Sequence, residues 1–119
     1  MEIKAFYEEV GGSFTEVMGR LLTEERIRRF VLRFPEDRTF FELCEGFDGG
    51  NWQQVFSCAH TMKGVCANLG LERLKEAASA LTENVRDLSG KPDTASLFET
   101  VRAEYEHTVS AIRKLAEIE

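Results

Sequence analysis

His60, Lys63 and Gly64 are the residues whose types and spacing could support chemistry. A neutral imidazole is a nitrogen nucleophile near physiological pH, and a lysine ammonium is a compact charge that binds phosphate groups. Residues three and four positions apart lie side by side on a helix, so Lys63 and Gly64 would both lie beside His60. A glycine inside a helix costs about 1 kcal/mol relative to alanine, but here it would leave open space next to the imidazole. The three residues therefore predict an accessible nucleophile with a cation beside it.

The segment from Asn51 to Leu71 predicts the helix that carries these residues. Asn51 can cap its start, with Gln54 three residues later as in a capping box, and Gly70 suits the left-handed position that ends many helices. Apolar residues recur every three or four positions, the period of one buried helical face: Trp52, Val55, Ala59, Met62, Cys66 and Leu69. At about 100° per residue, His60 points about 140° away from the centre of that face. We therefore expect His60 to face solvent.

The run His60-Thr61-Met62-Lys63-Gly64, followed by Asn68-Leu69-Gly70, resembles the motif of histidine-containing phosphotransfer (HPt) domains. That motif is His-x-x-Lys-Gly, followed by a short apolar run to a later glycine. Met62 and Cys66 replace the commoner leucine and small residue, and both replacements fall on the predicted buried face. The resemblance covers the whole chain and implies an up-down helical bundle. It also implies that Nε2 of His60, the ring nitrogen distal to the backbone, carries a phosphoryl group.

The same resemblance implies a function in a multistep His-Asp phosphorelay. His60 would accept a phosphoryl group from a receiver-domain aspartate and pass it to another receiver, with Lys63 near the phosphate and Gly64 clearing the approach. Phe56 and Ala67 would belong to the docking surface around His60. The expected partners are response-regulator receiver domains and a hybrid sensor kinase, with Mg²⁺ on the receiver and no cofactor on this chain. No Gly-rich loop ends in Lys-Ser/Thr, so we expect a phosphocarrier without its own ATP site or autokinase activity.

Other readings of the same residues remain open or are weaker. The chain could be a binding module or an inhibitor of a receiver or sensor kinase that works without phosphorylation. A hydrolase using His60 as a base lacks an oriented acid or nucleophile nearby. We expect no metal site, because Cys58 and His60 point about 160° apart on one helix and Cys66 belongs to the buried face. His107 is expected to be structural or incidental, and the role of Asn68 is left open.

Composition narrows the class of protein further. The 119 residues suffice for one domain with a modest core, and the net charge of −6 argues against a nucleic-acid partner. No apolar run approaches the roughly 20 residues of a membrane span, and no signal peptide is recognisable at the start. Three cysteines within helical patterns are typical of reduced thiols. We therefore expect a cytoplasmic protein, and we expect it to be a monomer.

The rest of the chain predicts further helices around the central one. Two short helices are expected over 4–10 and 13–22, and a third over 23–34, where Pro35 ends it. A short helix over 39–44 is followed by a turn at Gly46 and at Gly49-Gly50. Two long helices are expected over 71–88, with Leu88 on the buried side, and over 94–115; Leu22 and Phe30 are likewise expected on apolar faces. The prediction is an all-α protein: a single domain, 1–119, built on an antiparallel up-down four-helix bundle of about residues 38–119, with short additional N-terminal helices.

Overall fold

A computed structural model describes residues 1–117 of the chain. This part of the chain contains helices and no strands. In order these are α1 (Ile3–Glu9), α2 (Phe14–Leu21), α3 (Glu24–Arg33), the 3₁₀ turn η1 (Phe34–Glu36), α4 (Thr39–Asp48), α5 (Trp52–Leu69), α6 (Glu72–Asn84) and α7 (Thr94–Glu117).

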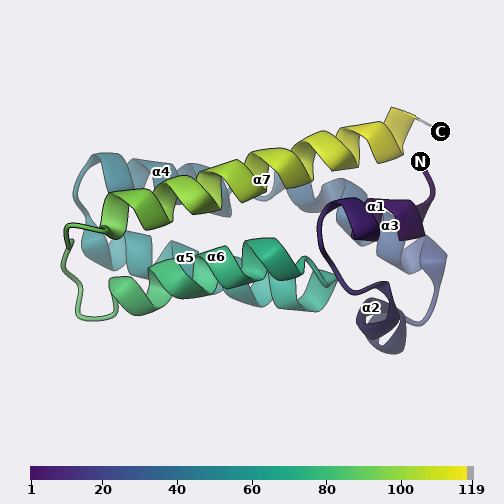
Figure 1. The fold of residues 1–119 in the computed structure, drawn as a ribbon, viewed down its shortest axis with the longest axis horizontal. Helices are drawn as coiled ribbons and strands as arrows, with labels where there is room; N and C mark the ends of the chain where they lie inside the picture. The colour runs from purple at the N-terminus through teal and green to yellow at the C-terminus, as the bar shows by residue number, and fades with distance from the viewer. Residues whose placement is uncertain (118–119) are drawn as a thin grey trace.

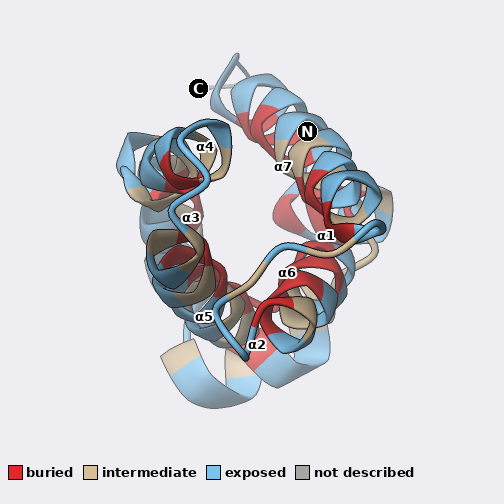
Figure 2. Cartoon of the chain, turned by 90° about the vertical axis from the view of Figure 1, so that its left-hand side faces the viewer, coloured by how far each residue is buried: buried red, intermediate tan, exposed pale blue. Residues whose placement is uncertain are grey.

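The long helices form the predicted four-helix bundle. Helices α5 and α6 run antiparallel beside each other, and α7 lies across from them (Figure 1). The fourth edge is made by α3 and α4, which follow one another along the bundle and are joined by η1. Seen from the end, the buried residues face the space between these four edges (Figure 2). The predicted all-α fold is therefore confirmed, with the short helices α1 and α2 at one end.

Aromatic rings hold α4 against α7. Phe40 stacks on Tyr105 with 4.0 Å between the ring centres, and Phe47 stacks on Phe98 at 4.2 Å. Stacked pairs of this kind contribute about 0.5–1.5 kcal/mol beyond the area that they bury. Phe98 is fully buried, although the spacing of apolar residues favours its neighbour Leu97, which is only half-buried.

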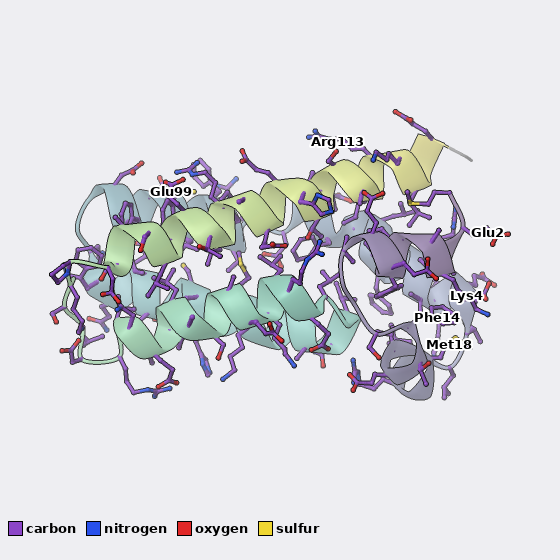
Figure 3. All side chains as sticks on the ribbon, viewed as in Figure 1. Glu2, Lys4, Phe14, Met18, Glu99 and Arg113 are labelled. Carbon is purple, nitrogen blue, oxygen red and sulfur yellow. The ribbon has the colours of Figure 1, made fainter. Side chains whose placement is uncertain are left out.

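The N-terminal helices are fastened to the end of α5 at Gly70. The Tyr7 hydroxyl donates a 2.6 Å hydrogen bond to the carbonyl of Leu69, and the Ser13 amide donates one of 3.0 Å to the carbonyl of Gly70. Only a glycine fits at position 12, because a Cβ there would lie 2.3 Å from the carbonyl oxygen of Gly70. Nearby, Lys4 lies over the ring of Phe14, which joins α1 to α2 (Figure 3).

Local signals for helix starts are confirmed. The side chains of Ser13, Thr23 and Asn51 each accept a hydrogen bond from the backbone amide three residues later, at 3.3, 3.1 and 3.1 Å. These bonds satisfy amides that have no partner within the helix. Gly70 ends α5 in the left-handed conformation, with φ of 69°.

The predicted turn at Gly46 is wrong. Helix α4 continues to Asp48, and Gly46 is a buried residue inside it. A Cβ at Gly46 would lie 3.0 Å from Cγ of Gln54 and 3.2 Å from the backbone nitrogen of Val55. The glycine therefore serves close packing of α4 against α5, and the turn begins at Gly49.

Three leucine and phenylalanine positions expected on apolar faces are exposed instead. Leu22 is 65% exposed, Leu88 is 48% exposed and Phe30 is 42% exposed. Leu22 and Leu88 lie beyond the ends of α2 and α6, with φ of 72° and 62°, so the helical period no longer applies to them. Phe30 stays within α3, but it faces outward beside α2 and α5.

Candidate functional site

Helix α5 presents His60 to solvent because its opposite side is committed to the core. Val55, Ala59, Met62 and Cys66 are buried, whereas His60 is exposed. The helix is fixed at both ends, by the Asn51 cap and by Gly70. The structure confirms the expectation that His60 faces solvent.

The Phe56 ring lies one turn before His60 and next to its imidazole. The two ring centres are 6.1 Å apart, and the ring planes are tilted by only 11°. Phe56 is half-buried, so its position is set by packing while the imidazole remains open. Phe56 thus flanks one side of the imidazole and leaves the rest of the ring accessible.

Lys63, Gly64 and Ala67 complete the same face of α5. Lys63 and Ala67 are half-buried, and Gly64 is exposed. Within the described residues, a Cβ added to Gly64 would have no atom of another element within 4 Å. The structure therefore places the residues selected from the sequence on one helix: an exposed imidazole, a lysine, a glycine with open space around it and two flanking apolar side chains.

Two charged residues that the sequence pattern does not reveal come from the end of α6 and the turn after it. The guanidinium of Arg86, in that turn, lies over the Phe56 ring, 5.5 Å from its centre. Arg86 also pairs with Glu83 at 2.6 Å. This hydrogen bond, together with the charges of Arg86 and Lys63, lowers the pKa of the Glu83 carboxyl.

Charged side chains of both signs thus lie beside this face of α5: Lys63 on α5 itself, Glu83 on α6 and Arg86 in the turn after α6. No signal in the sequence could place Arg86 there, because its position depends on how two segments of the chain pack. A cation near an imidazole can stabilise a phosphoryl group that carries close to two negative charges, and Lys63 is the i+3 neighbour of His60.

The other candidate groups lie elsewhere. Nε2 of His107 is 3.1 Å from the carbonyl oxygen of Glu9, so this histidine links α7 to α1. Cys58 and Cys66 are buried, and burial raises the pKa of both thiols, to about 12 at Cys66. Within residues 1–117, no three His, Cys, Asp or Glu side chains are grouped so that they could hold a metal ion.

No helix in the described part of the chain is long and apolar enough to cross a membrane. Helix α7 is the longest, with 24 residues, but its exposed side carries charged residues such as Glu99, Glu106 and Arg113.

Comparison with known proteins agrees with this geometry. The family model of the Hpt domain matches residues 22–113 and so covers most of the chain. No curated protein and no solved structure matches the chain significantly. Hpt domains are helical bundles that act as phosphocarriers, through histidine phosphotransfer, in two-component phosphorelays. An exposed histidine on a bundle helix, within a sequence that the family model matches over most of its length, means that this chain belongs to the Hpt domain family.

Proposed function

We propose that His60 is the phosphoacceptor of a multistep His-Asp phosphorelay. The observation that carries this proposal is the exposed imidazole of His60, with Lys63 and the open space at Gly64 beside it. Nε2 attacks the phosphorus of an aspartyl phosphate on a receiver domain. The bond from phosphorus to the aspartate oxygen breaks, and that aspartate leaves as a free carboxylate. The reverse attack, by another receiver aspartate, moves the phosphoryl group onward.

The residues around His60 each have a role in this step. Phosphoryl transfer depends on in-line placement and charge stabilisation more than on covalent help from the protein. Phe56 flanks the imidazole, and Lys63 provides positive charge near the phosphoryl oxygens. Arg86, in the turn after α6, lies over the Phe56 ring and is paired with Glu83. Ala67 and Phe56 form a small apolar surface that the receiver contacts.

The partners supply what this chain does not. The receiver brings the aspartate and Mg²⁺, and a hybrid sensor kinase provides the phosphoryl group at the start of the relay. This chain is a phosphocarrier without autokinase activity, which its lack of a Gly-rich phosphate-binding sequence supports. We propose that it works as a monomer in the cytoplasm.

A transfer assay tests the proposal. The chain is incubated with phosphorylated receivers, and the label that it acquires is checked for stability in base and lability in acid, the behaviour of phosphohistidine. We expect His60→Gln to abolish labelling and His107→Gln to leave it unchanged, because His107 contacts only the backbone at α1. Both variants should keep the fold, since exposed substitutions change stability within about 0.5 kcal/mol. Label on the His60→Gln variant would rule the assignment out.

The same variants identify the alternative function. A module that binds or inhibits a receiver without phosphorylation would keep its affinity for that receiver in His60→Gln, while wild type would acquire no label.

A further inference from the structure

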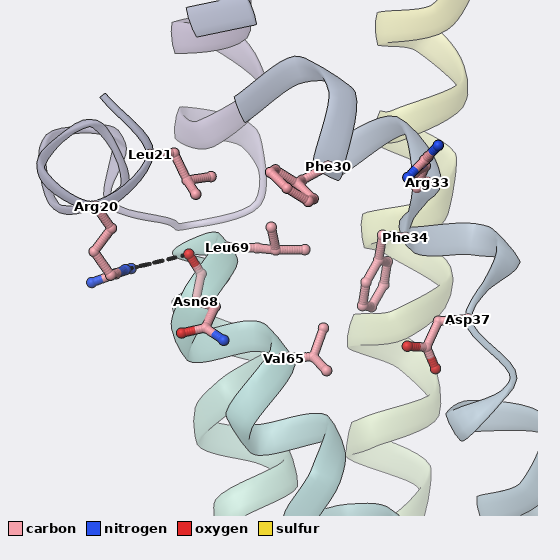
Figure 4. A pocket seen from close by; sticks show the side chains of 9 residues that line it. All are labelled: Arg20, Leu21, Phe30, Arg33, Phe34, Asp37, Val65, Asn68 and Leu69. Carbon is pink, nitrogen blue, oxygen red and sulfur yellow. Dashed lines mark hydrogen bonds between the residues drawn. The ribbon is translucent and has the colours of Figure 1, made fainter. Parts of the chain in front are cut away.

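A second surface lies on the bundle edge where α2 and α3 meet the end of α5. It contains an open pocket of about 390 Å³ (Figure 4). The pocket is walled mostly by apolar side chains, namely Leu21, Phe30, Phe34, Val65 and Leu69. Arg20 and Arg33 stand at opposite sides of it. An apolar hollow of this size accommodates one or two large apolar side chains of a partner.

An exposed row of arginines extends from the pocket along α3. Arg26, Arg29, Phe30 and Arg33 recur at the spacing of one helical face, and each of the four is exposed. Phe30 thus lies at the centre of a positively charged face and also at the edge of the pocket. We call this face, together with the pocket, the α3 arginine surface.

The charge of the α3 arginine surface is balanced only in part from within the protein, although one carboxylate, that of Asp37, also lines the pocket. In the described part of the chain, Arg26 and Arg33 have no carboxylate partner, and Arg29 reaches Glu25 only at 3.7 Å. Arg20 donates to the backbone carbonyls of Ala67 and Asn68.

Cations later in the chain are paired instead. Carboxylates lie within 2.5–3.5 Å of six of them: Arg73, Lys75, Arg86, Lys91, Arg102 and Lys114. The chain as a whole has a net charge of −6. The positive charge concentrated at α3 is therefore suited to an acidic partner.

This surface adjoins the helix that carries His60, because Arg20 at the pocket donates a 2.6 Å hydrogen bond to the backbone carbonyl of Ala67 on α5. Val65 and Asn68, which line the pocket, are on α5, five and eight residues after His60. At 1.5 Å per residue, Asn68 is only about 12 Å further along the helix. A stable protein interface covers about 800 Å² on each partner, an area much larger than one helix face. A receiver seated on His60 therefore has to extend over neighbouring elements.

Two pocket residues come from outside the segment that the family model matches. That match begins at residue 22, whereas Arg20 and Leu21 belong to α2. The pocket is therefore completed by an N-terminal helix that the family match does not include.

We propose that the α3 arginine surface is an accessory docking site for the receiver domain that exchanges a phosphoryl group with His60. Its occupant is an acidic stretch of the receiver that carries an apolar side chain, which enters the pocket while carboxylates pair with Arg26 and Arg33. This inference rests on the proposed function, because it extends the footprint of the same partner. The contact selects among receivers and speeds their encounter, whereas the transfer step itself remains at His60.

Charge reversal tests the proposal with a matched control. Arg33→Glu alters the surface, and Arg113→Glu makes the same change of charge at an exposed position on α7, away from α2 (Figure 3). Affinity for the receiver is measured by titration calorimetry at low and high salt, and the KM and kcat of phosphoryl transfer are measured in parallel. We expect Arg33→Glu to raise the Kd and the KM about tenfold or more at low salt and to weaken their salt dependence. We expect Arg113→Glu to stay within about twofold of wild type, since scattered rim charges contribute little.

Two further variants guard against a folding artefact. Arg26→Glu places a carboxylate in the first turn of α3, where the helix dipole favours it, and should weaken binding like Arg33→Glu. Phe30→Ser removes the apolar edge of the pocket and should weaken binding without changing its salt dependence. Melting curves establish that each variant is folded.

Several results would overturn the proposal. Equal effects of Arg33→Glu and Arg113→Glu would mean that only net charge matters, and a fall in kcat at unchanged KM would place Arg33 in the transfer step. Loss of a wild-type dimer in Arg33→Glu, seen by light scattering, would make a second copy of the chain the occupant. Arg33-dependent binding to phosphatidylserine vesicles, with unchanged receiver affinity, would make it a lipid surface.

The two proposals fail in different ways. Arg33-dependent receiver binding without labelling of His60 would keep the docking site and reject the phosphorelay role. Labelling of His60 with equal receiver affinity in all of these variants would keep the phosphorelay role and reject the docking site.

Discussion

At the scale of single residues, Lys63 and Gly64 have different effects beside His60. Lys63 adds a positive charge, and Gly64 leaves open space. Lys63 is the i+3 neighbour of His60, and its charge already acts on Glu83 of α6. Gly64 is the i+4 neighbour and leaves that side of the imidazole uncovered. In the proposed relay, Lys63 would therefore affect the stability of the phosphoryl group, and Gly64 would affect how closely a partner can come.

We expect Lys63→Ala to slow phosphoryl transfer without abolishing it, and to leave the melting temperature unchanged. The ammonium stabilises the phosphoryl oxygens through a charge-assisted contact, while Arg86 keeps some positive charge in place. The measurements are the transfer rate and the lifetime of phosphohistidine. The control is Lys75→Ala, which removes a lysine that is paired with Glu72 on α6. If the rate and the lifetime match wild type, Lys63 is an ordinary surface residue.

Stability and transfer are expected to separate at Gly64. Gly64→Ala should stabilise the domain by up to about 1 kcal/mol, because it removes the penalty of a glycine within a helix. Gly64→Gln and Gly64→Leu should also fold, since the position is open. Transfer should fall as the side chain grows, because a displacement on the order of 1 Å can cost ~100-fold in rate. Melting curves and receiver-to-protein transfer rates check both parts.

At the scale of elements, α4 and α5 approach closely at Gly46, which makes this glycine the natural counterpart of Gly64. Gly46→Leu should destabilise the domain by about 1–3 kcal/mol or more, because the side chain would be forced against Gln54 and the backbone of Val55. Gly64→Leu, the same substitution in α5, serves as the control and should melt near wild type. Unfolding in urea measures both. Equal stability of the two variants would show that α4 can shift away from α5 at little cost.

The helices could be predicted from the sequence wherever their signals were local. Ser13, Thr23 and Asn51 are recognisable as caps because the bonds that they accept come from three residues away. His60 could be placed because the buried side of α5 follows one period over five turns. Features that depend on two elements escaped prediction. Gly46 is a turn residue by type, and only the closeness of α5 explains why it lies inside a helix.

The same limit applies within the candidate site. His60, Lys63, Gly64, Phe56 and Ala67 belong to one helix, so spacing alone brings them together. Glu83 reaches the site from α6 and Arg86 from the turn after it, and their place depends on how this segment packs against α5. Phe98 was missed for a related reason: the last helix buries a broad face, and its stack on Phe47 selects Phe98 over Leu97.

At the scale of the whole molecule, the proposed relay would require a single phosphoacceptor to serve more than one partner. The chain measures 42 × 26 × 19 Å along its principal axes, and a standard interface takes about 800 Å² of its surface. Each receiver has to bring its aspartate in line with His60. Two receivers therefore cannot occupy the site together, and the phosphoryl group has to be handed on in separate encounters.

We expect one receiver to inhibit transfer from another competitively. A second receiver whose aspartate is replaced by alanine should raise the KM for the first phosphorylated receiver and leave kcat unchanged. The measurement is the initial labelling rate of this chain over a range of both receivers. A receiver that does not bind this chain is the control at equal concentration. A lowered kcat at constant KM would mean that both receivers bind at once.

The attachment of α1 and α2 at Gly70 implies that the α3 arginine surface exists in a closed state and an open state. Tyr7 and Ser13 each donate one hydrogen bond to the end of α5. Helix α1 also buries Ile3, Phe6 and Tyr7, whereas α2 buries only Val17, so we expect α2 to open locally while the bundle stays folded. An open state loses Arg20 and Leu21 from the pocket, and the apparent affinity of a docked partner then falls with the fraction of closed molecules. Tyr7→Phe should increase that open fraction, seen as faster amide hydrogen exchange in α2 than in α6. The hydrogen bonds at Gly70 would thus determine the fraction of molecules that can bind a partner, while His60 would determine the transfer of the phosphoryl group after binding.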